Sequence, residues 1–286
     1  MKINDCCEKC LLDKYMAKIP SSANETKKRE YAKVLFEAVS ESRMLSAPEV
    51  VEKIERVHAR FFGPGQAYRE IKRYFNQMML SKEEMLYQKT SAASDPMKLA
   101  VQFAMAGNFI DFGAMKSVDE EKLNAFFDKA DQTPLNAEVF SEFKDEIMKA
   151  KRLVFFTDNC GEIVADKVLM RVIKEMNPRI HITAVVRGFP ALNDATLEDA
   201  EQVRLIECID EILPNGTGVA GTVLSRLPKE ADEAVKLADV CISKGQGNYE
   251  SLCGCGLNLF YIFMCKCDLF ADRFRVPLYG GVLTKE

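Results

Sequence analysis

Residues 153–164, LVFFTDNCGEIV, indicate how the chain is built. The apolar and β-branched run over residues 153–157 predicts a short buried strand. The apolar residues of 163–176 recur with the 3.6-residue period of a helix. Asp158 and Asn159 therefore lie between the end of a buried strand and the start of a helix. Open α/β sheets bind anionic ligands at such a place, which makes these two residues the first candidates for a functional site.

The C-terminal half of the sequence repeats this alternation of strand and helix. Further strands are predicted at residues 180–186, 208–213, 238–243 and 259–267, with helical patterns between them. Strands joined by crossover helices form a parallel sheet that is covered on both faces, which is an α/β fold. Right-handed crossovers then place the carboxyl ends of the first, second and fourth strands along one edge of the sheet.

The N-terminal part of the sequence has a different, helical pattern. Apolar residues recur at helical spacing over residues 25–86, and Asp95 followed by Pro96 is typical of the start of a further helix. We therefore expect two domains. Residues 1–95 should form a helical subdomain, and residues 96–286 should form the α/β domain.

Composition limits the classes of partner. The 286 residues carry a net charge of −4, and no lysine–arginine stripe alternates with aromatic residues, so a nucleic-acid partner is not expected. The N-terminus lacks the apolar core of a signal peptide, and no run of about 18 apolar residues suggests a membrane span. We expect a cytoplasmic protein whose ten cysteines are reduced thiols, some of them available to a metal.

Polar residues follow three of the predicted strands. With only two histidines in the chain, a histidine-rich zinc site is excluded. Carboxylate and amide oxygens at Asp158, Asn159, Asn193 and Asp194 suit a hard divalent cation such as Mg²⁺ or Mn²⁺. Lys244, within SKGQG, suits a phosphate oxygen, with backbone N–H groups as further donors. Taken singly, each residue also fits a helix cap, a turn or a solvated side chain.

Two further motifs are weaker on their own. Asn108 and Asp111 lie in GNFID, directly after a predicted helix, where Gly-Asn is also a common helix end. Cys7 and Cys10 have the Cys-x-x-Cys spacing of half a zinc-like site or of a redox pair. They are therefore candidates for a second metal or redox site, although small buried thiols explain the same pattern.

Several motifs together resemble a known family. DNCGEIV at residues 158–164, RGFPALNDAT at 187–196 and SKGQGNYE at 243–250 occur in order, with AGNFID at 106–111 and the Cys-x-x-Cys before them. This set is similar to the DUF89 or ARMT1-like damage-control phosphatases, which are metal-dependent. The N-terminal Cys-x-x-Cys looks like the mark of the stand-alone prokaryotic subfamily.

The resemblance carries expectations about fold and chemistry. It implies a three-layer α/β/α domain with a mostly parallel, Rossmann-like sheet, joined to a helical N-terminal domain. It also implies hydrolysis of phosphate monoesters of small metabolites, such as nucleotides or sugar phosphates, including damaged ones. The cofactor would be a divalent metal ion (Mg²⁺, Mn²⁺, Co²⁺ or Ni²⁺). No oligomeric state is predicted.

The resemblance also assigns roles to residues. The metal would be held by Asp158, Asn159 and Asp194, and Asp158, Asp194 and Lys244 would be catalytic, with metal-activated water or Asp158 as the nucleophile. The positions expected to bind the phosphorylated substrate are Asn108, Asp111, Arg187, Asn193, Lys244, Gly245 and Gln246.

Other functions fit the sequence less well. A haloacid-dehalogenase-type phosphatase requires Asp-x-Asp-x-Thr after its first strand, and DNCG stands there instead. A Rossmann-like methyltransferase using S-adenosylmethionine is the alternative to a phosphatase, but it requires a glycine-rich turn where only Gly161 is found. A non-enzymatic, cysteine-centred metal-binding protein is the third possibility.

Overall fold

A computed structural model describes residues 1–63, 68–110 and 119–286 of the chain. Its helices are α1 (Asp5–Ala17), α2 (Glu25–Ser40), α3 (Ala47–Phe62), α4 (Arg69–Ser91), α5 (Pro96–Gly107), α6 (Glu120–Asp128), α7 (Ala137–Lys149), α8 (Glu162–Met176), α9 (Leu197–Gln202), α10 (Lys229–Leu237), α11 (Gln246–Leu252) and α12 (Asp268–Phe274). Short 3-10 helices are η1 (Ala130–Gln132), η2 (Leu205–Glu207) and η3 (Leu224–Arg226). Within the described ranges, every helix is too short or too polar to span a lipid bilayer.

The strands are β1 (Arg152–Phe156), β2 (His181–Val186), β3 (Glu211–Pro214), β4 (Val240–Lys244), β5 (Leu259–Met264) and β6 (Gly281–Lys285). In the described residues they form one sheet with the order β3-β2-β1-β4-β5-β6. The first five strands run parallel, which confirms the predicted α/β fold. The sixth strand is a finding that the sequence pattern does not predict. It pairs antiparallel with β5, from Phe260 opposite Lys285 to Met264 opposite Gly281.

The direction of strand addition reverses between β1 and β4. From β1 the chain adds β2 and β3 on one side, and it then returns to add β4 and β5 on the other side. The segments that follow β1 and β4 therefore turn away from each other and leave a crevice at the carboxyl ends of these two strands. Sheets of this kind bind their ligands in that crevice.

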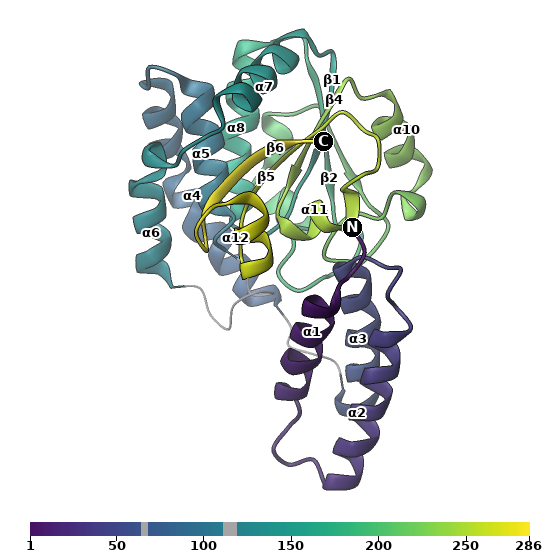
Figure 1. The fold of residues 1–286 in the computed structure, drawn as a ribbon. Coiled ribbons are helices and arrows are strands. Elements are labelled where there is room, and N and C mark those ends of the chain that lie inside the picture. The colour runs from purple at the N-terminus through teal and green to yellow at the C-terminus, as the bar shows by residue number, and fades with distance from the viewer. Residues whose placement is uncertain (64–67, 111–118) are drawn as a thin grey trace.

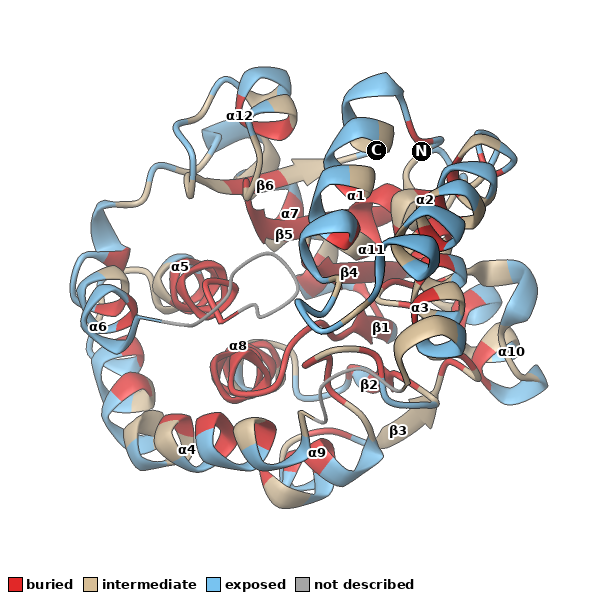
Figure 2. Ribbon diagram, turned by 90° about the horizontal axis from the view of Figure 1, so that it is seen from below, coloured by how far each residue is buried: buried red, intermediate tan, exposed pale blue. Residues whose placement is uncertain are grey.

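Helices cover both faces of the sheet and give the predicted three layers (Figure 1). Alternate residues of a strand point to opposite faces. Phe155 and Ile242 belong to a core shared with α4 to α9, whereas Phe156 and Cys241 belong to a core shared with α10, α11 and α12. Helices α5 and α8 are buried on nearly all sides, as Figure 2 shows.

Helices α1, α2 and α3 form a helical unit that projects from the sheet (Figure 1). Its own core contains Tyr31, Leu35 and Ile54. His58 lies against this core, with Nδ1 3.0 Å from the Tyr31 hydroxyl. This histidine is therefore a packed residue rather than part of a catalytic group.

Helix α4 packs against α5, α8 and α9, and its buried apolar residues belong to a different core from that of the helical unit. Its buried residues Phe75, Met79 and Leu86 join the core around α8, and α4 lies against α8 along its length. The core of the helical unit ends in α3, and the predicted boundary between domains at residue 95 stays a prediction. Helical periodicity identifies the buried face of a helix, but it does not identify the core that the face covers.

This packing predicts different responses to two core substitutions of the same kind. Leu86→Ala in α4 and Leu35→Ala in α2 should each cost about 2–5 kcal/mol of local stability. Because stability is lost first in the core that contains the cavity, Leu86→Ala should speed amide hydrogen exchange in α8 and β1. Leu35→Ala should speed exchange in α1 and α3 and leave β1 protected. Faster exchange in α1 and α3 after Leu86→Ala would contradict the assignment of α4 to the sheet.

Candidate active site

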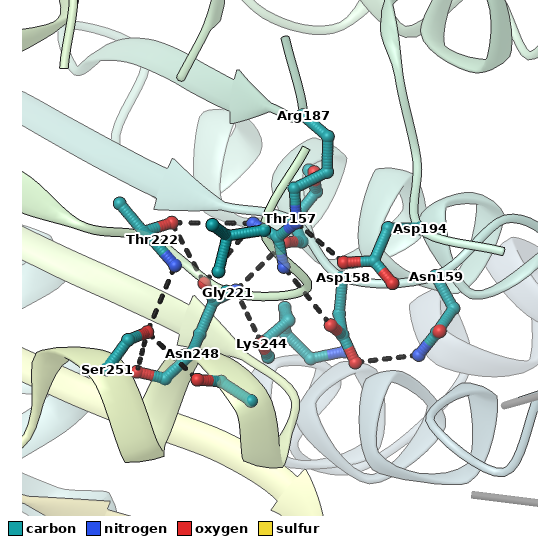
Figure 3. A network of polar contacts seen from close by, with 12 residues as sticks. Thr157, Asp158, Asn159, Arg187, Asp194, Gly221, Thr222, Lys244, Asn248 and Ser251 are labelled. Atoms are coloured by element: carbon teal, nitrogen blue, oxygen red, sulfur yellow. Dashed lines mark hydrogen bonds and ion pairs between the residues drawn. The ribbon is translucent and has the colours of Figure 1, made fainter. Parts of the chain in front are cut away.

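The loops after β1 and β2 meet at the carboxyl edge of the sheet. Asn159 and Asp194 form an isolated antiparallel bridge. The Cys160 N–H donates to Asn193 O at 2.9 Å, and the Ala195 N–H donates to Asp158 O at 2.7 Å. These backbone contacts bring Asp158, Asn159 and Asp194 together, as Figure 3 shows.

Arg187 joins the two aspartates. It is fully buried, its Nε lies 2.6 Å from Asp194 Oδ2, and its Nη2 lies 3.4 Å from Asp158 Oδ1. Its Nη1 lies 3.4 Å from Thr222 Oγ1 and 3.3 Å from Asn248 Oδ1 (Figure 3). The sequence predicts a substrate contact for Arg187. In the structure the guanidinium bridges two carboxylates, and this leaves the second oxygen of each outside the bridge.

Two asparagines hold the opposite side of the site. The Asn108 Nδ2 donates to Asp158 Oδ2 at 3.1 Å and to both oxygens of Glu162 at 2.9 Å. The Asn193 Nδ2 donates to Asn159 Oδ1 at 3.0 Å. Asn108 and Asn193 therefore orient the predicted metal ligands. Asp111, predicted beside Asn108, lies outside the described residues.

The loop after β4 closes the site. Gly245 has φ +81°, and a Cβ atom at this position would overlap the Asp158 carboxylate. Only glycine therefore allows the backbone to approach the carboxylate this closely. The contact places the ends of β1 and β4 side by side, at the crevice where the strand order reverses.

Lys244 is buried and fully paired. Its Nζ lies 2.6 Å from Glu162 Oε1, 2.6 Å from Asp166 Oδ1 and 2.9 Å from Ala104 O, so each of its three N–H groups has an acceptor. Burial alone would lower the pKa of Lys244, but Asp166 and Glu162 raise it above its usual value. The ammonium group therefore faces α5 and α8, and the predicted contact to phosphate stays a prediction.

Burial raises the pKa of two carboxyl groups in the site. The pKa of Asp158 is well above its usual range because of burial and because of the Asp194 and Glu162 carboxylates. The pKa of Asp166 is raised to about 7, mainly by burial, although Lys244 opposes the shift. Both shifts arise mainly because burial disfavours the charged form of a carboxyl group.

The buried residues of the site carry more negative than positive charge. In the described part of the chain, the site contains four buried carboxylates, those of Asp158, Glu162, Asp166 and Asp194. It contains two buried cations, Arg187 and Lys244. When all six are ionised, their formal charge is −2. A divalent cation would neutralise that charge. The donor set of two carboxylates and one amide oxygen, at Asp158, Asp194 and Asn159, fits a hard divalent ion.

The remaining predicted residues lie apart from these contacts. The Gln246 side chain accepts from Lys266 N at 3.1 Å and lies 3.7 Å from Cys267 Sγ, on the loop after β5. Cys7 is half-buried and Cys10 is exposed, both as free thiols on α1. Among the residues that the structure describes, no group of three or more His, Cys, Asp or Glu side chains is arranged to hold a metal. The predicted second site at the cysteines therefore gains no further ligand.

A cleft lies beside the site. Its volume is about 970 Å³, and α3 and α4 line it together with residues 189–192 and Thr196. Residues 189–192 precede Asn193 and Asp194 in the chain, but among the described residues the candidate metal ligands Asp158, Asn159 and Asp194 do not line the cleft. Charged residues from both halves of the chain, including Arg56 of α3 and Glu198 of α9, line the rest.

The close approach of Gly245 to Asp158 predicts the result of one substitution. Gly245→Ala should lower the free energy of unfolding by about 2–4 kcal/mol, from backbone strain and the displaced carboxylate. Gly256→Ala is a matched control because Gly256 has the same φ, +81°, with nothing within 4 Å of its Cβ position. It should cost only about 1–2 kcal/mol of strain. Equal losses in denaturant unfolding would contradict the contact.

The pairing of Lys244 predicts a second result. Lys244→Met should destabilise the fold by about 3–5 kcal/mol because it leaves two buried carboxylates without their cation. Lys285→Met is the control, since Lys285 also pairs with two carboxylates, Glu142 and Glu146, but near the surface. It should cost at most about 1 kcal/mol in the same unfolding measurement. A loss at Lys244 no larger than at Lys285 would mean that the buried ion pairs are dispensable.

Comparison with known proteins agrees with the fold and with the predicted phosphatase family. Residues 3–282 match the damage-control phosphatase ARMT1-like domain. A damage-control phosphatase of Archaeoglobus fulgidus is 32% identical over all of this chain and 99% of its own length. The damage-control phosphatase PH1575 of Pyrococcus horikoshii is 32% identical over 71% of each chain.

A solved structure supports the same fold. The crystal structure of the DUF89 family protein ph1575 from Pyrococcus horikoshii superposes with a TM-score of 0.81 at 23% identity, covering 100% of this chain and 99% of that one. The homologues support a phosphatase rather than the alternative methyltransferase. Because the family match spans residues 3–282 and one relative aligns over the whole chain, this chain belongs to the damage-control phosphatase ARMT1-like family.

Proposed function

We propose that the chain is a divalent-metal-dependent phosphatase that hydrolyses phosphate monoesters of small metabolites. The observation that carries the proposal is the meeting of Asp158, Asn159 and Asp194 with Gly245 at the point where the strand order reverses. Membership of a phosphatase family supports the reaction class.

Asp158, Asp194 and Asn159 Oδ1 would hold the metal ion. When bound, a divalent cation supplies positive charge to the phosphoryl oxygens during attack at phosphorus. The excess of carboxylates over cations among the buried groups supports the binding of a cation. The oxygen-only donor set suits Mg²⁺, Mn²⁺, Co²⁺ or Ni²⁺.

The protein's own groups would orient the reaction. Arg187 fixes one oxygen of Asp158 and one of Asp194, so neither carboxylate rotates as the substrate binds. The other oxygen of Asp158 accepts from Asn108 and Asn159. Because Asp158 is assigned to the metal ion and also accepts from Arg187, Asn108 and Asn159, we assign the attack to a water molecule rather than to this carboxylate.

The 970 Å³ cleft would hold the rest of the substrate. Its volume is in the range of small-molecule sites, and the lining residues 189–192 directly precede Asn193 and Asp194 in the chain. A small phosphorylated metabolite, such as a nucleotide or a sugar phosphate, is therefore the proposed partner, without nucleic acid or membrane. Ten free thiols support a reducing, cytoplasmic location.

The proposal predicts phosphate release that depends on metal. Purified protein should release phosphate from members of a phosphometabolite panel with Mn²⁺, Mg²⁺, Co²⁺ or Ni²⁺ and should lose that activity in EDTA. Asp194→Asn should weaken metal binding at least about tenfold. Asp232→Asn, which alters a surface pair with Lys236, should bind metal as the wild type does. Undiminished activity in chelator would contradict the proposal.

A further inference from the structure

Glu162 connects three of the predicted site residues. It is the first residue of α8, and its side chain is fully buried. Its carboxylate accepts from Asn108 Nδ2 at 2.9 Å, from Asn159 Nδ2 at 2.8 Å and from Lys244 Nζ at 2.6 Å. The sequence contains Glu162 within the DNCGEIV motif, but nothing in the residue spacing assigns it a role.

The contacts of Glu162 decide which way the Asn159 amide faces. The Asn159 Nδ2 lies 2.8 Å from Glu162 Oε2 and 2.7 Å from Asp158 Oδ2, and it donates to both. The Asn159 Oδ1 is on the opposite side and accepts from Asn193 Nδ2 at 3.0 Å. A reversed amide would turn its oxygen toward two carboxylates and its NH₂ group toward the NH₂ group of Asn193. Both changes replace hydrogen bonds by repulsion.

The orientation matters because only one end of an amide binds a cation. A carboxamide donates to metal ions through its oxygen, whereas its NH₂ group has no free lone pair to offer. Asn159 is therefore a metal ligand in one of its two orientations only. The buried carboxylates, rather than Asn159 itself, determine which orientation is present.

We propose that Glu162 is a positioning residue that holds the Asn159 NH₂ group and so directs Asn159 Oδ1 to the metal ion. This inference rests on the proposed metal-dependent function. Lys244 completes the arrangement, since its ammonium group binds Glu162 Oε1 and leaves Oε2 to Asn159. Lys244 then acts on the metal site through Glu162, in addition to any contact with substrate.

Glu162 also has a structural role as a partner of Lys244. The test must separate this role from the orientation of the Asn159 amide. Asp166→Asn is the matched control because Asp166 is also a buried carboxyl group 2.6 Å from Lys244 Nζ and has no hydrogen bond to Asn159 in the described contacts. The experiment titrates Mn²⁺ alone into chelator-treated protein and measures affinity by calorimetry. Thermal unfolding and circular dichroism of each variant show whether it is folded.

Glu162→Gln should weaken Mn²⁺ binding by about 10- to 100-fold, the range typical of groups that orient metal ligands. The loss at Asp166→Asn should be clearly smaller. The decisive variants carry Asn159→Asp, because a carboxylate presents an oxygen on either side and does not need to be oriented. In that background Glu162→Gln should leave Mn²⁺ affinity unchanged or raise it, since a repulsive carboxylate has been removed.

Equal weakening by Glu162→Gln with and without the Asn159→Asp substitution would overturn the inference, as would equal losses for Glu162→Gln and Asp166→Asn. The wild-type protein could release phosphate and bind Mn²⁺, with Glu162→Gln binding Mn²⁺ equally well. That result would leave the proposed function standing and reject the positioning role. Wild-type protein that neither binds Mn²⁺ nor releases phosphate would reject the proposed function, and this inference with it.

Discussion

The carboxyl edge of the sheet concentrates more buried negative charge than its buried cations neutralise. Arg187 joins Asp158 to Asp194, and Lys244 joins Glu162 to Asp166, so each cation is shared between two carboxylates. Isolated ionised carboxylates in such surroundings would be costly to bury, and the raised pKa of Asp158 reflects that cost. A bound cation would reduce this excess of negative charge. Much of the surrounding structure can be understood as support for this arrangement.

The fold supplies that support through the order of its strands. Because β1 lies in the centre of the sheet, the loops after β2 and β4 both reach the residues that follow β1. Gly245 lets the β4 loop approach Asp158, and the bridge between Asn159 and Asp194 holds the β2 loop against it. The helical unit α1–α3 lies on the side of the cleft away from the sheet and provides part of its lining. One half of the molecule therefore holds the reacting groups, and both halves enclose the space beside them.

Much of the fold could be predicted from sequence, because hydrophobic period and helix starts are local properties. The strands of the parallel sheet, the helix after Asp158 and the shared edge of strands one, two and four follow from such patterns. The β6 strand and the placement of α4 could not be predicted, since both depend on which distant surface a short or amphipathic segment covers. Local patterns do not contain that information.

The site was predictable as a set of polar residues, but not as a set of contacts. Asp158, Asn159 and Asp194 could be singled out because they follow buried strands. Lys244 in a glycine-rich stretch suggested an accessible cation, yet its chain runs inward to meet α8. Glu162 resembled an ordinary first-turn acid of a helix, and only the burial of that turn reveals its pairing with Asn108, Asn159 and Lys244.

The central claim is that a single divalent ion occupies the position between Asp158, Asn159 and Asp194. Anomalous X-ray diffraction from crystals grown with Mn²⁺ tests this most directly. The account predicts one strong anomalous peak per chain, within coordination distance, roughly 2.0–2.2 Å, of oxygens from all three side chains. No peak at that position, or a peak only at Cys7 and Cys10, would contradict it.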